Sequence, residues 1–146
     1  MERIGEILEE KGRKVHITSP SATVFDAVLT MCEARVGALL VTVDGTPCGI
    51  ISERDVLTRV LLDKRDASRT RVEEVMTRDV ACIGPETMAR EAMAIMTERR
   101  CRHLPVVLDG RVIGMISIGD LVRWASREQE FEVRMLTDYV RGTYPG

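Results

Sequence analysis

A glycine, a serine and an aspartate recur in this sequence with the spacing Gly-x-x-Ser-x-x-Asp. The motif stands once at 49–55 (GIISERD) and once at 114–120 (GMISIGD). A serine followed three residues later by an acid is typical of a helix start, where the two side chains cap backbone amides. The same atoms could bind a nucleotide, because the free N–H groups of a helix start suit a phosphate and an aspartate can accept both hydroxyls of a ribose.

The glycine of each motif favours the binding interpretation. Gly49 and Gly114 carry no side chain, so a ligand can approach the strand backbone closely there. The whole seven-residue pattern also recurs at a fixed offset of 65 residues, although either helix could be capped by other residues. Capping alone and nucleotide binding therefore remain two interpretations of the same motif.

The two motifs are part of an internal repeat that fills most of the chain. The same offset, without a gap, superposes Val15 on Val80, Pro20 on Pro85, Ala27 on Ala92, Met31 on Met96, Leu39 on Leu104 and Asp44 on Asp109. We expect a first repeat over residues 1–66, a second repeat over 67–127 and a separate C-terminal segment over 128–146.

Each repeat is predicted to fold as strand, helix, strand, strand, helix, with opening strands at 15–18 and 80–83. Apolar residues at helical spacing predict first helices that bury Val24, Ala27, Val28 and Met31 in one repeat and Ala89, Ala92, Met93 and Met96 in the other. Aliphatic runs on either side of an Asp-Gly pair predict hairpins over 38–43 and 47–51, and over 104–108 and 111–116. The second helices carry Val56, Val60 and Leu61, or Leu121, Val122 and Ala125.

The composition of the segments around the repeats predicts a linker and two short helical turns. Residues 63–71 are polar and charged and are predicted to link the two repeats. Residues 72–76 are predicted to form a helical turn before the second repeat, with 4–8 as the counterpart before the first. A unit of roughly 60 residues is small to be stable alone, so we expect the two copies to pack together.

Composition excludes several classes of protein. The chain has 146 residues, 45% apolar and 30% charged, with a net charge of −2. This balance gives no electrostatic reason to expect binding to nucleic acid or to an anionic membrane. The chain has no apolar run of about 20 residues, and its first residues are charged where a signal peptide is apolar. We expect a soluble, cytoplasmic protein.

The four cysteines are far apart in the sequence and form no C-x-x-C pair. Cys32, Cys48, Cys82 and Cys101 are expected to be buried or half-buried thiols in a reducing compartment. Cys101 and His103 are the one Cys/His pair close in sequence, and they lack a third ligand nearby. We therefore expect no metal site.

The two motifs resemble those of cystathionine-β-synthase (CBS) domains, a pair of which is called a Bateman module. The resemblance covers about residues 4 to 127: both motifs fit the Gly-apolar-x-Ser/Thr-x-x-Asp signature, and HLPVVLDGRVIG at 103–114 is typical of a second repeat. The chain is most similar to short stand-alone CBS-pair proteins of bacteria and plant organelles. The resemblance implies an α/β (α+β) fold of tandem β-α-β-β-α repeats with small mixed sheets, packed about a pseudo-twofold axis.

The resemblance also implies that the clefts between the repeats bind adenosine-containing ligands: AMP, ADP, ATP, and in some members NAD(H) or S-adenosylmethionine. Carried over by position, Asp55 and Asp120 would take the ribose hydroxyls, while Ser52 and Ser117 would face the phosphate. Gly49 and Gly114 would allow the close approach. Adenine would lie against the ends of the opening strands and the starts of the next ones, at Thr18, Ile83, Ala38 and His103.

Phosphate groups need cations, and the arginines near the ends of the first helices are the candidates. They are Arg35 in the first repeat and Arg100 and Arg102 in the second, with His103 beside them. The alternative is that these arginines only complement the negative end of a helix dipole. The sequence leaves both interpretations open.

The C-terminal segment carries Phe131, Met135, Leu136 and Tyr139 at helical spacing. A helix of this length needs another surface to pack against. It could fold back on its own chain or cross to a second one, and because CBS pairs commonly form homodimers the second is expected.

No motif for catalysis is present in the sequence, neither a nucleophile elbow nor a P-loop nor a zinc-protease signature. The predicted function is that of a non-catalytic regulatory module, which binds an adenosyl ligand and transmits its occupancy to an unknown effector protein. Two alternatives remain: a structural dimerisation module whose motifs are only helix caps, and a redox-linked regulator of a thioredoxin-type partner.

Overall fold

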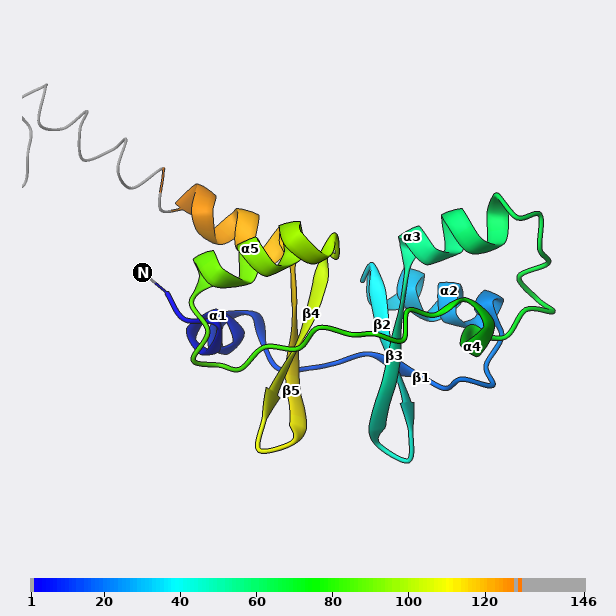
Figure 1. The fold of residues 1–146 in the computed structure, drawn as a ribbon, viewed down its shortest axis with the longest axis horizontal. Coiled ribbons are helices and arrows are strands. Elements are labelled where there is room, and N and C mark those ends of the chain that lie inside the picture. Colours follow the sequence, from blue (N-terminus) through cyan, green and yellow to red (C-terminus); the bar gives the residue numbers. More distant parts are fainter. Residues whose placement is uncertain (1, 128, 130–146) are drawn as a thin grey trace, which may run out of the picture. The chain divides into compact units, whose positions relative to one another are not determined.

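The helices and strands follow the repeat of the sequence in a computed structural model, which describes residues 2–127 and 129 (Figure 1). The elements in chain order are α1 (Ile4–Lys11), β1 (Ile17–Thr18), α2 (Val24–Ala34), β2 (Ala38–Val43), β3 (Thr46–Ser52), α3 (Glu53–Val56), η1 (Leu57–Leu61), α4 (Val72–Val75), α5 (Ala89–Arg99), β4 (His103–Leu108) and β5 (Arg111–Ser117). Residues 118–127 are helical. The helix predicted around Met135 lies outside the described residues.

The chain divides into two compact units, and neither coincides with a sequence repeat. The Ser52 unit is Lys14–Ala81, and the Ser117 unit joins Met1–Arg13 to Cys82–Gly146. Each unit therefore holds the body of one repeat together with the short helix that precedes the other repeat in sequence. The repeat boundary at 66/67 stays an interpretation of the sequence.

The Ser52 unit contains a three-stranded sheet in the order β1-β2-β3, with β1 parallel to β2 and β2 antiparallel to β3. The hairpin turn is made by Asp44 and Gly45, both at positive φ (50° and 80°), as the predicted Asp-Gly turn requires. The core of this unit draws on α2, the sheet, η1 and α4: Val24, Ala27, Met31, Leu39, Val41, Ile51, Val60, Val72, Val75 and Met76.

The polar segment 63–71 lies against the first turn of α2. Its carbonyls at Ala67 and Thr70 accept hydrogen bonds from the backbone N–H groups of Phe25 and Val24, which have no acceptor inside the helix. The hydroxyl of Thr23 caps the same helix by accepting from the N–H of Asp26 at 3.1 Å. The predicted linker is therefore a structural part of the Ser52 unit.

The Ser117 unit combines the hairpin β4-β5 and α5 with α1, which comes from the other end of the chain (Figure 1). The side chain of Leu8 on α1 lies against the strand β5 at Gly114. Apolar residues of both parts are buried: Ile4, Ile7, Leu8, Ala89, Ala92, Met96, Leu104, Val106, Ile116 and Leu121. The helix predicted at 4–8 is confirmed and extends to Lys11.

Two details of the predicted elements are wrong. The opening strands are shorter than expected: β1 has two residues, and 80–83 contributes only a parallel bridge from Ile83 to Val106. The second helices bury Val60 and Leu121 as expected. Leu61 and Val122 are instead 65% and 51% exposed, 57–61 forms a π-helical turn, and Trp124 is buried.

Candidate functional site

The first motif forms a complete capping box at the junction of β3 and α3. The hydroxyl of Ser52 accepts from the N–H of Asp55 at 3.3 Å, and the N–H of Ser52 donates to Asp55 Oδ2 at 3.0 Å. The Ser52 hydroxyl also donates to the same carboxylate oxygen, at 3.1 Å. The sequence spacing thus positions the Asp55 carboxylate by binding one of its two oxygens to the start of its own helix.

The second oxygen of Asp55 faces the segment after α4. Thr77 Oγ1 donates to Asp55 Oδ1 at 3.2 Å, and Thr77 itself is held on β3 by two backbone hydrogen bonds with Ile50. The guanidinium Nε of Arg59 lies 3.9 Å from the same oxygen, and Arg59 Nη1 donates to the carbonyls of Val75 and Met76. A distance of 3.9 Å is too long for a hydrogen bond, so a neutral hydroxyl is the main partner of Oδ1.

The second motif repeats the capping geometry with different partners. The N–H of Ser117 donates to Asp120 Oδ2 at 2.8 Å, and the Ser117 hydroxyl accepts from the N–H of Asp120 at 3.2 Å. Lys11 Nζ, at the end of α1, donates to Asp120 Oδ2 at 2.7 Å. Arg123 Nη2 donates to Asp120 Oδ1 at 2.5 Å. Both oxygens of Asp120 therefore contact cations.

The pKa of the Asp120 carboxyl reflects these contacts. Burial by itself would raise this pKa, but the hydrogen bonds from Lys11 and from the backbone of Ser117 outweigh it and hold the pKa of Asp120 below its ordinary value. The carboxylate is thus ionised throughout the neutral range and remains the counterion of Lys11.

A pH dependence of stability follows from the low pKa of Asp120. Its stabilising contribution is present above the unfolded-state pKa of about 3.9 and is lost as pH falls through the lower folded-state value. We expect Asp120→Asn to lower the free energy of unfolding by about 1–2 kcal/mol at pH 6. The difference from the wild type should shrink below pH 4. Urea unfolding of both proteins at pH 6 and pH 3 measures it, and a difference that is equal at the two pH values contradicts the assignment.

The glycines of the two motifs contact protein side chains. A Cβ at Gly49 would lie 2.8 Å from Met76 Sδ and 2.8 Å from the carbonyl oxygen of Thr77. A Cβ at Gly114 would lie 2.7 Å from Leu8 Cδ2. The close approach expected for a ligand is thus made at these positions by the chain itself, because the helices α4 and α1 pack against the strands there.

The residues expected around adenine do not all lie together. In each unit the first residue of the next strand is directly opposite the motif serine: Ala38 pairs with Ser52, and His103 pairs with Ser117. Thr18 instead pairs with Val41, and Ile83 with Val106, each three positions farther along the strand. Three residues of strand span about 10 Å. Ala38 and His103 therefore lie in the row of the motif serines, whereas Thr18 and Ile83 lie in the row of the motif glycines, because Val41 pairs with Gly49 and Val106 with Gly114.

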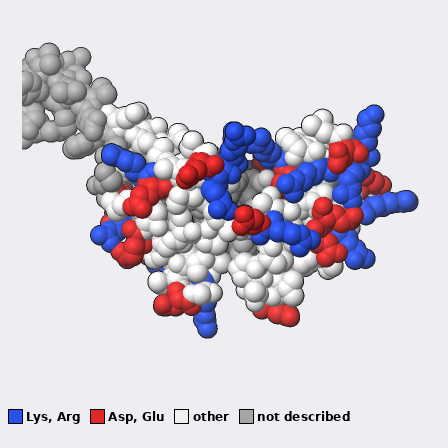
Figure 2. Space-filling model, viewed as in Figure 1, with Lys and Arg blue, Asp and Glu red and all other residues white. Residues whose placement is uncertain are grey.

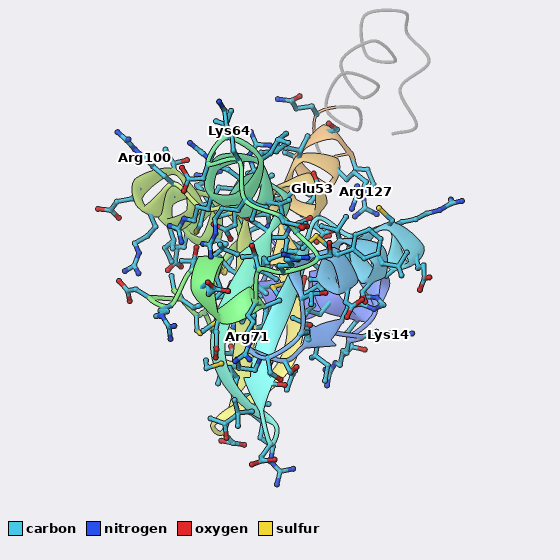
Figure 3. All side chains as sticks on the ribbon, turned by 90° about the vertical axis from the view of Figure 1, so that its right-hand side faces the viewer. Lys14, Glu53, Lys64, Arg71, Arg100 and Arg127 are labelled. Atoms are coloured by element: carbon cyan, nitrogen blue, oxygen red, sulfur yellow. The ribbon has the colours of Figure 1, made fainter. Side chains whose placement is uncertain are left out.

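Two of the three arginine candidates stand directly after the helices α2 and α5. Arg35 follows α2 and Arg100 follows α5, both in the left-handed conformation (φ 56° and 53°) and both exposed; Figure 3 shows Arg100 at the surface. This placement fits the helix-dipole interpretation. Arg102 is exposed, and its backbone carbonyl accepts from the N–H of Ile118 at 2.8 Å. In the Ser52 unit, the carbonyl of Gly37 likewise accepts a hydrogen bond from the backbone N–H of Glu53.

His103 is half-buried beside the second motif. Burial lowers the pKa of its imidazole, the positive charges of Lys11 and Arg102 lower it further, and the Asp120 carboxylate opposes the shift. The imidazole is therefore neutral at pH 7. A neutral ring with a donor and an acceptor suits recognition of a polar ligand edge rather than of phosphate.

The cysteine expectation is wrong for two of the four thiols. Cys32 and Cys82 are exposed, whereas Cys48 and Cys101 are half-buried, and none of these four described cysteines forms a disulfide. Within residues 2–127, no three His, Cys, Asp or Glu side chains gather as a metal ion requires. Charges of both signs alternate over the face shown in Figure 2. None of the helices in the described part of the chain has the length and apolarity to cross a membrane.

Two α/β units built on one repeated capping motif define a tandem-repeat protein. The CBS domain profile matches residues 4–62 and 72–127, so the chain belongs to the CBS domain family. CBS-pair proteins are generally non-catalytic regulatory modules, and many bind adenosyl ligands.

The relatives are CBS-domain proteins of plants and microorganisms. The chain is 37% identical over 150 residues to the mitochondrial CBS domain-containing protein CBSX3 of Arabidopsis thaliana, covering 97% of this chain and 73% of CBSX3. Another curated plant relative is much longer, and the chain spans 22% of it. The structure of a putative signal-transduction protein with CBS domains from Burkholderia ambifaria MC40-6 is 42% identical, with a TM-score of 0.84, over 87% of this chain and 96% of that one.

A more distant structure carries a ligand. The CBS domain protein PAE2072 of Pyrobaculum aerophilum, complexed with AMP, is 24% identical with a TM-score of 0.72, over 81% of this chain and 88% of that chain. At this identity the match shows a shared fold.

Several residues that shape the two motifs were missed by sequence reasoning. Four come from distant segments: Leu8, Lys11, Met76 and Thr77. The other two, Arg59 and Arg123, lie one helical turn after Asp55 and Asp120. The amphipathic pattern of 4–8 indicated a buried face for α1. Nothing in the sequence indicated that its last residue reaches Asp120.

Proposed function

We propose that this protein is a non-catalytic regulatory module that binds an adenosine-containing ligand through its Ser-Asp motifs and transmits the occupancy to another protein. The observation that carries the proposal is the Asp55 carboxylate. Its Oδ2 is held by Ser52, and its Oδ1 accepts a hydrogen bond from the Thr77 hydroxyl. A ribose hydroxyl is the same kind of donor, so it can take the place of Thr77 on a carboxylate that is already oriented.

The relatives support the choice of ligand class. Proteins of the CBS domain family commonly bind adenosyl compounds, and the structure of PAE2072 is a complex with AMP. The residues proposed to bind the ligand are Ser52, Asp55, Ser117 and Asp120, with Ala38 and His103 at the same level of the sheets. Thr18, Ile83 and the three arginines stay predictions for ligand contact. Gly49 and Gly114 also stay predictions, although Met76 and Leu8 occupy the space beside them.

A thermal-shift screen tests this proposal. A ligand present at about 100 times its dissociation constant adds about 2.7 kcal/mol to stability, which raises the melting temperature of a domain of this size by about 5–10 °C. We expect AMP, ADP, ATP, NAD, NADH or S-adenosylmethionine to produce such a shift. Asp55→Ala should reduce it, while the exposed linker variant Asp63→Ala should leave it unchanged.

The capping boxes favour one alternative, a structural module in which the motifs serve only as helix caps. Both boxes are complete without a ligand. In that case no adenine compound shifts the melting temperature, and Asp55→Ala shows only the loss of a cap, about 0.5–2 kcal/mol. The redox alternative has less support at Cys101 and Cys82, because partial desolvation raises the pKa of these two thiols and so reduces the reactive thiolate there.

The assembly and location of the protein are parts of the proposal. We expect a homodimer, because CBS pairs commonly form homodimers, and a dimer needs a surface for the second chain. The exposed apolar residues Phe25 and Leu29 on α2 offer such a surface. A cytoplasmic location is proposed for this chain, although the name of its relative CBSX3 places that protein in mitochondria.

A further inference from the structure

We infer that the two motif sites are unequal: an adenosyl ligand binds at Asp55, while Asp120 is occupied by the chain's own Lys11, which acts as a built-in competitor of the ribose. One ligand per chain is the consequence. The inference rests on the proposed function and specifies which of its two sites is open.

The exchange of partners at Asp55 is between like groups. A ribose hydroxyl that binds Oδ1 replaces the hydroxyl of Thr77, which donates at 3.2 Å. One neutral hydrogen bond is lost and one is gained, so the exchange itself is close to balanced. The freed Thr77 remains fixed by its backbone pairing with Ile50, so the strand geometry survives the exchange.

The exchange at Asp120 is between unlike groups. A ribose hydroxyl that binds Asp120 competes with the Lys11 ammonium for Oδ2 or with the Arg123 guanidinium for Oδ1. Hydrogen bonds to a charged donor are about twice as strong as neutral ones. The Asp120 side chain is only 5% exposed, so displacing its counterion leaves a buried charge with weaker partners. We expect binding at this site to be at least about tenfold weaker than at Asp55.

Lys11 is held in this position by the packing of α1. Its ammonium also donates to the carbonyl oxygen of Met115 at 2.5 Å, and its side chain is two-thirds buried. Leu8, one turn earlier, is fully buried against Gly114. The ion pair is therefore a fixed feature of a docked helix, unlike the pair of Arg13 and Glu9, in which both side chains are more than half exposed.

The two units differ at the same place in the fold. In the Ser52 unit, Met76 packs on Gly49 and the next residue, Thr77, supplies a hydroxyl to the aspartate. In the Ser117 unit, Leu8 packs on Gly114 and Lys11 supplies an ammonium. The one-turn helix α4 presents a neutral donor, and the two-turn helix α1 presents a charged one.

Titration calorimetry with AMP on the full chain tests the inference. The wild type should bind close to one AMP per chain. Asp55→Asn should lose this binding, and Asp120→Asn should retain it. Lys11→Met should add a second binding event with at least about tenfold higher affinity than the wild type shows at that site. The control is Lys64→Met, which removes an exposed lysine and should behave as the wild type. If Lys11→Met is too unstable to measure, Lys11→Gln removes the charge with a smaller change of shape.

The contact between Lys11 and Asp120 can also be tested in the absence of a ligand, through the neighbouring His103. Lys11 lowers the pKa of His103, so Lys11→Met should raise the pKa of His103 measured by NMR, and Lys64→Met should not. Three results would overturn the inference and leave the proposed function standing. The first is two equal AMP sites in the wild type. The second is loss of AMP binding in Asp120→Asn with retention in Asp55→Asn, and the third is an unchanged pKa of His103 in Lys11→Met. If neither the wild type nor any variant binds an adenosyl compound, the proposed function fails and the inference fails with it.

Discussion

Leu8→Ala is expected to destabilise the Ser117 unit by about 2–5 kcal/mol while leaving the Ser52 unit close to its wild-type stability. Leu8 is fully buried, and its methyl groups fill the space left by the missing side chain of Gly114. Shortening it to alanine removes apolar contacts and leaves a cavity between α1 and β5. The effect falls on residues more than a hundred positions away in the sequence because α1 belongs to that unit.

Two measurements separate the units. The single tryptophan, Trp124, lies in the Ser117 unit, so its fluorescence follows the unfolding of that unit in urea. Hydrogen exchange of the β2 and β3 amides follows the Ser52 unit. Val75→Ala in α4 is the matched variant, since Val75 is buried in the Ser52 unit and should show the reverse pattern. Leu8→Ala acting mainly on β2 and β3 would contradict the division into these units.

Gly49→Ala should cost about 1–3 kcal/mol and be more damaging than Gly114→Ala. At Gly49 the new Cβ would lie 2.8 Å from the backbone oxygen of Thr77, which cannot withdraw because it accepts a hydrogen bond from Ile50. At Gly114 the three atoms nearest to the new Cβ all belong to the side chain of Leu8, at 2.7–3.4 Å. Side-chain ends can rotate or shift by a few tenths of an ångström, and the lower chain entropy of alanine in the unfolded state offsets part of the cost.

Chemical unfolding of the two variants gives this comparison, and Gly84→Ala is the control. A Cβ at Gly84 has its nearest contact 3.9 Å away, at the carbonyl of Val107, which is an ordinary distance. Equal losses of stability at Gly49 and Gly114 would show that the Thr77 carbonyl yields as easily as a side chain.

The regular elements of this fold could be predicted from the sequence because their signals are local. The Asp-Gly pairs fixed both hairpin turns, and the apolar spacing in 24–31 and 89–96 located α2 and α5. The serine and aspartate of each motif are three residues apart, so their capping geometry follows from helix geometry alone. The errors in the second helices come from packing: Trp124 is buried where the spacing favoured Val122.

The surroundings of the two aspartates could not be predicted in the same way. Thr77 is 22 residues from Asp55, and Lys11 is 109 residues from Asp120. Both contacts depend on the packing of α4 and α1 against strands of the other repeat, which no local periodicity describes. The sequence shows two equivalent motifs, and the structure gives one a hydroxyl partner and the other an ammonium.

The joining of Met1–Arg13 to Cys82–Gly146 affects how the protein is made. On a translating ribosome, the apolar face of α1 is synthesised first but acquires its partner strand β5 only after about a hundred further residues, some 5–20 seconds at ordinary elongation rates. The Ser52 unit is contiguous in sequence and can fold during that interval. A nascent chain stalled before β5 should therefore expose Ile4, Ile7 and Leu8 to chaperones, with half of the molecule already native.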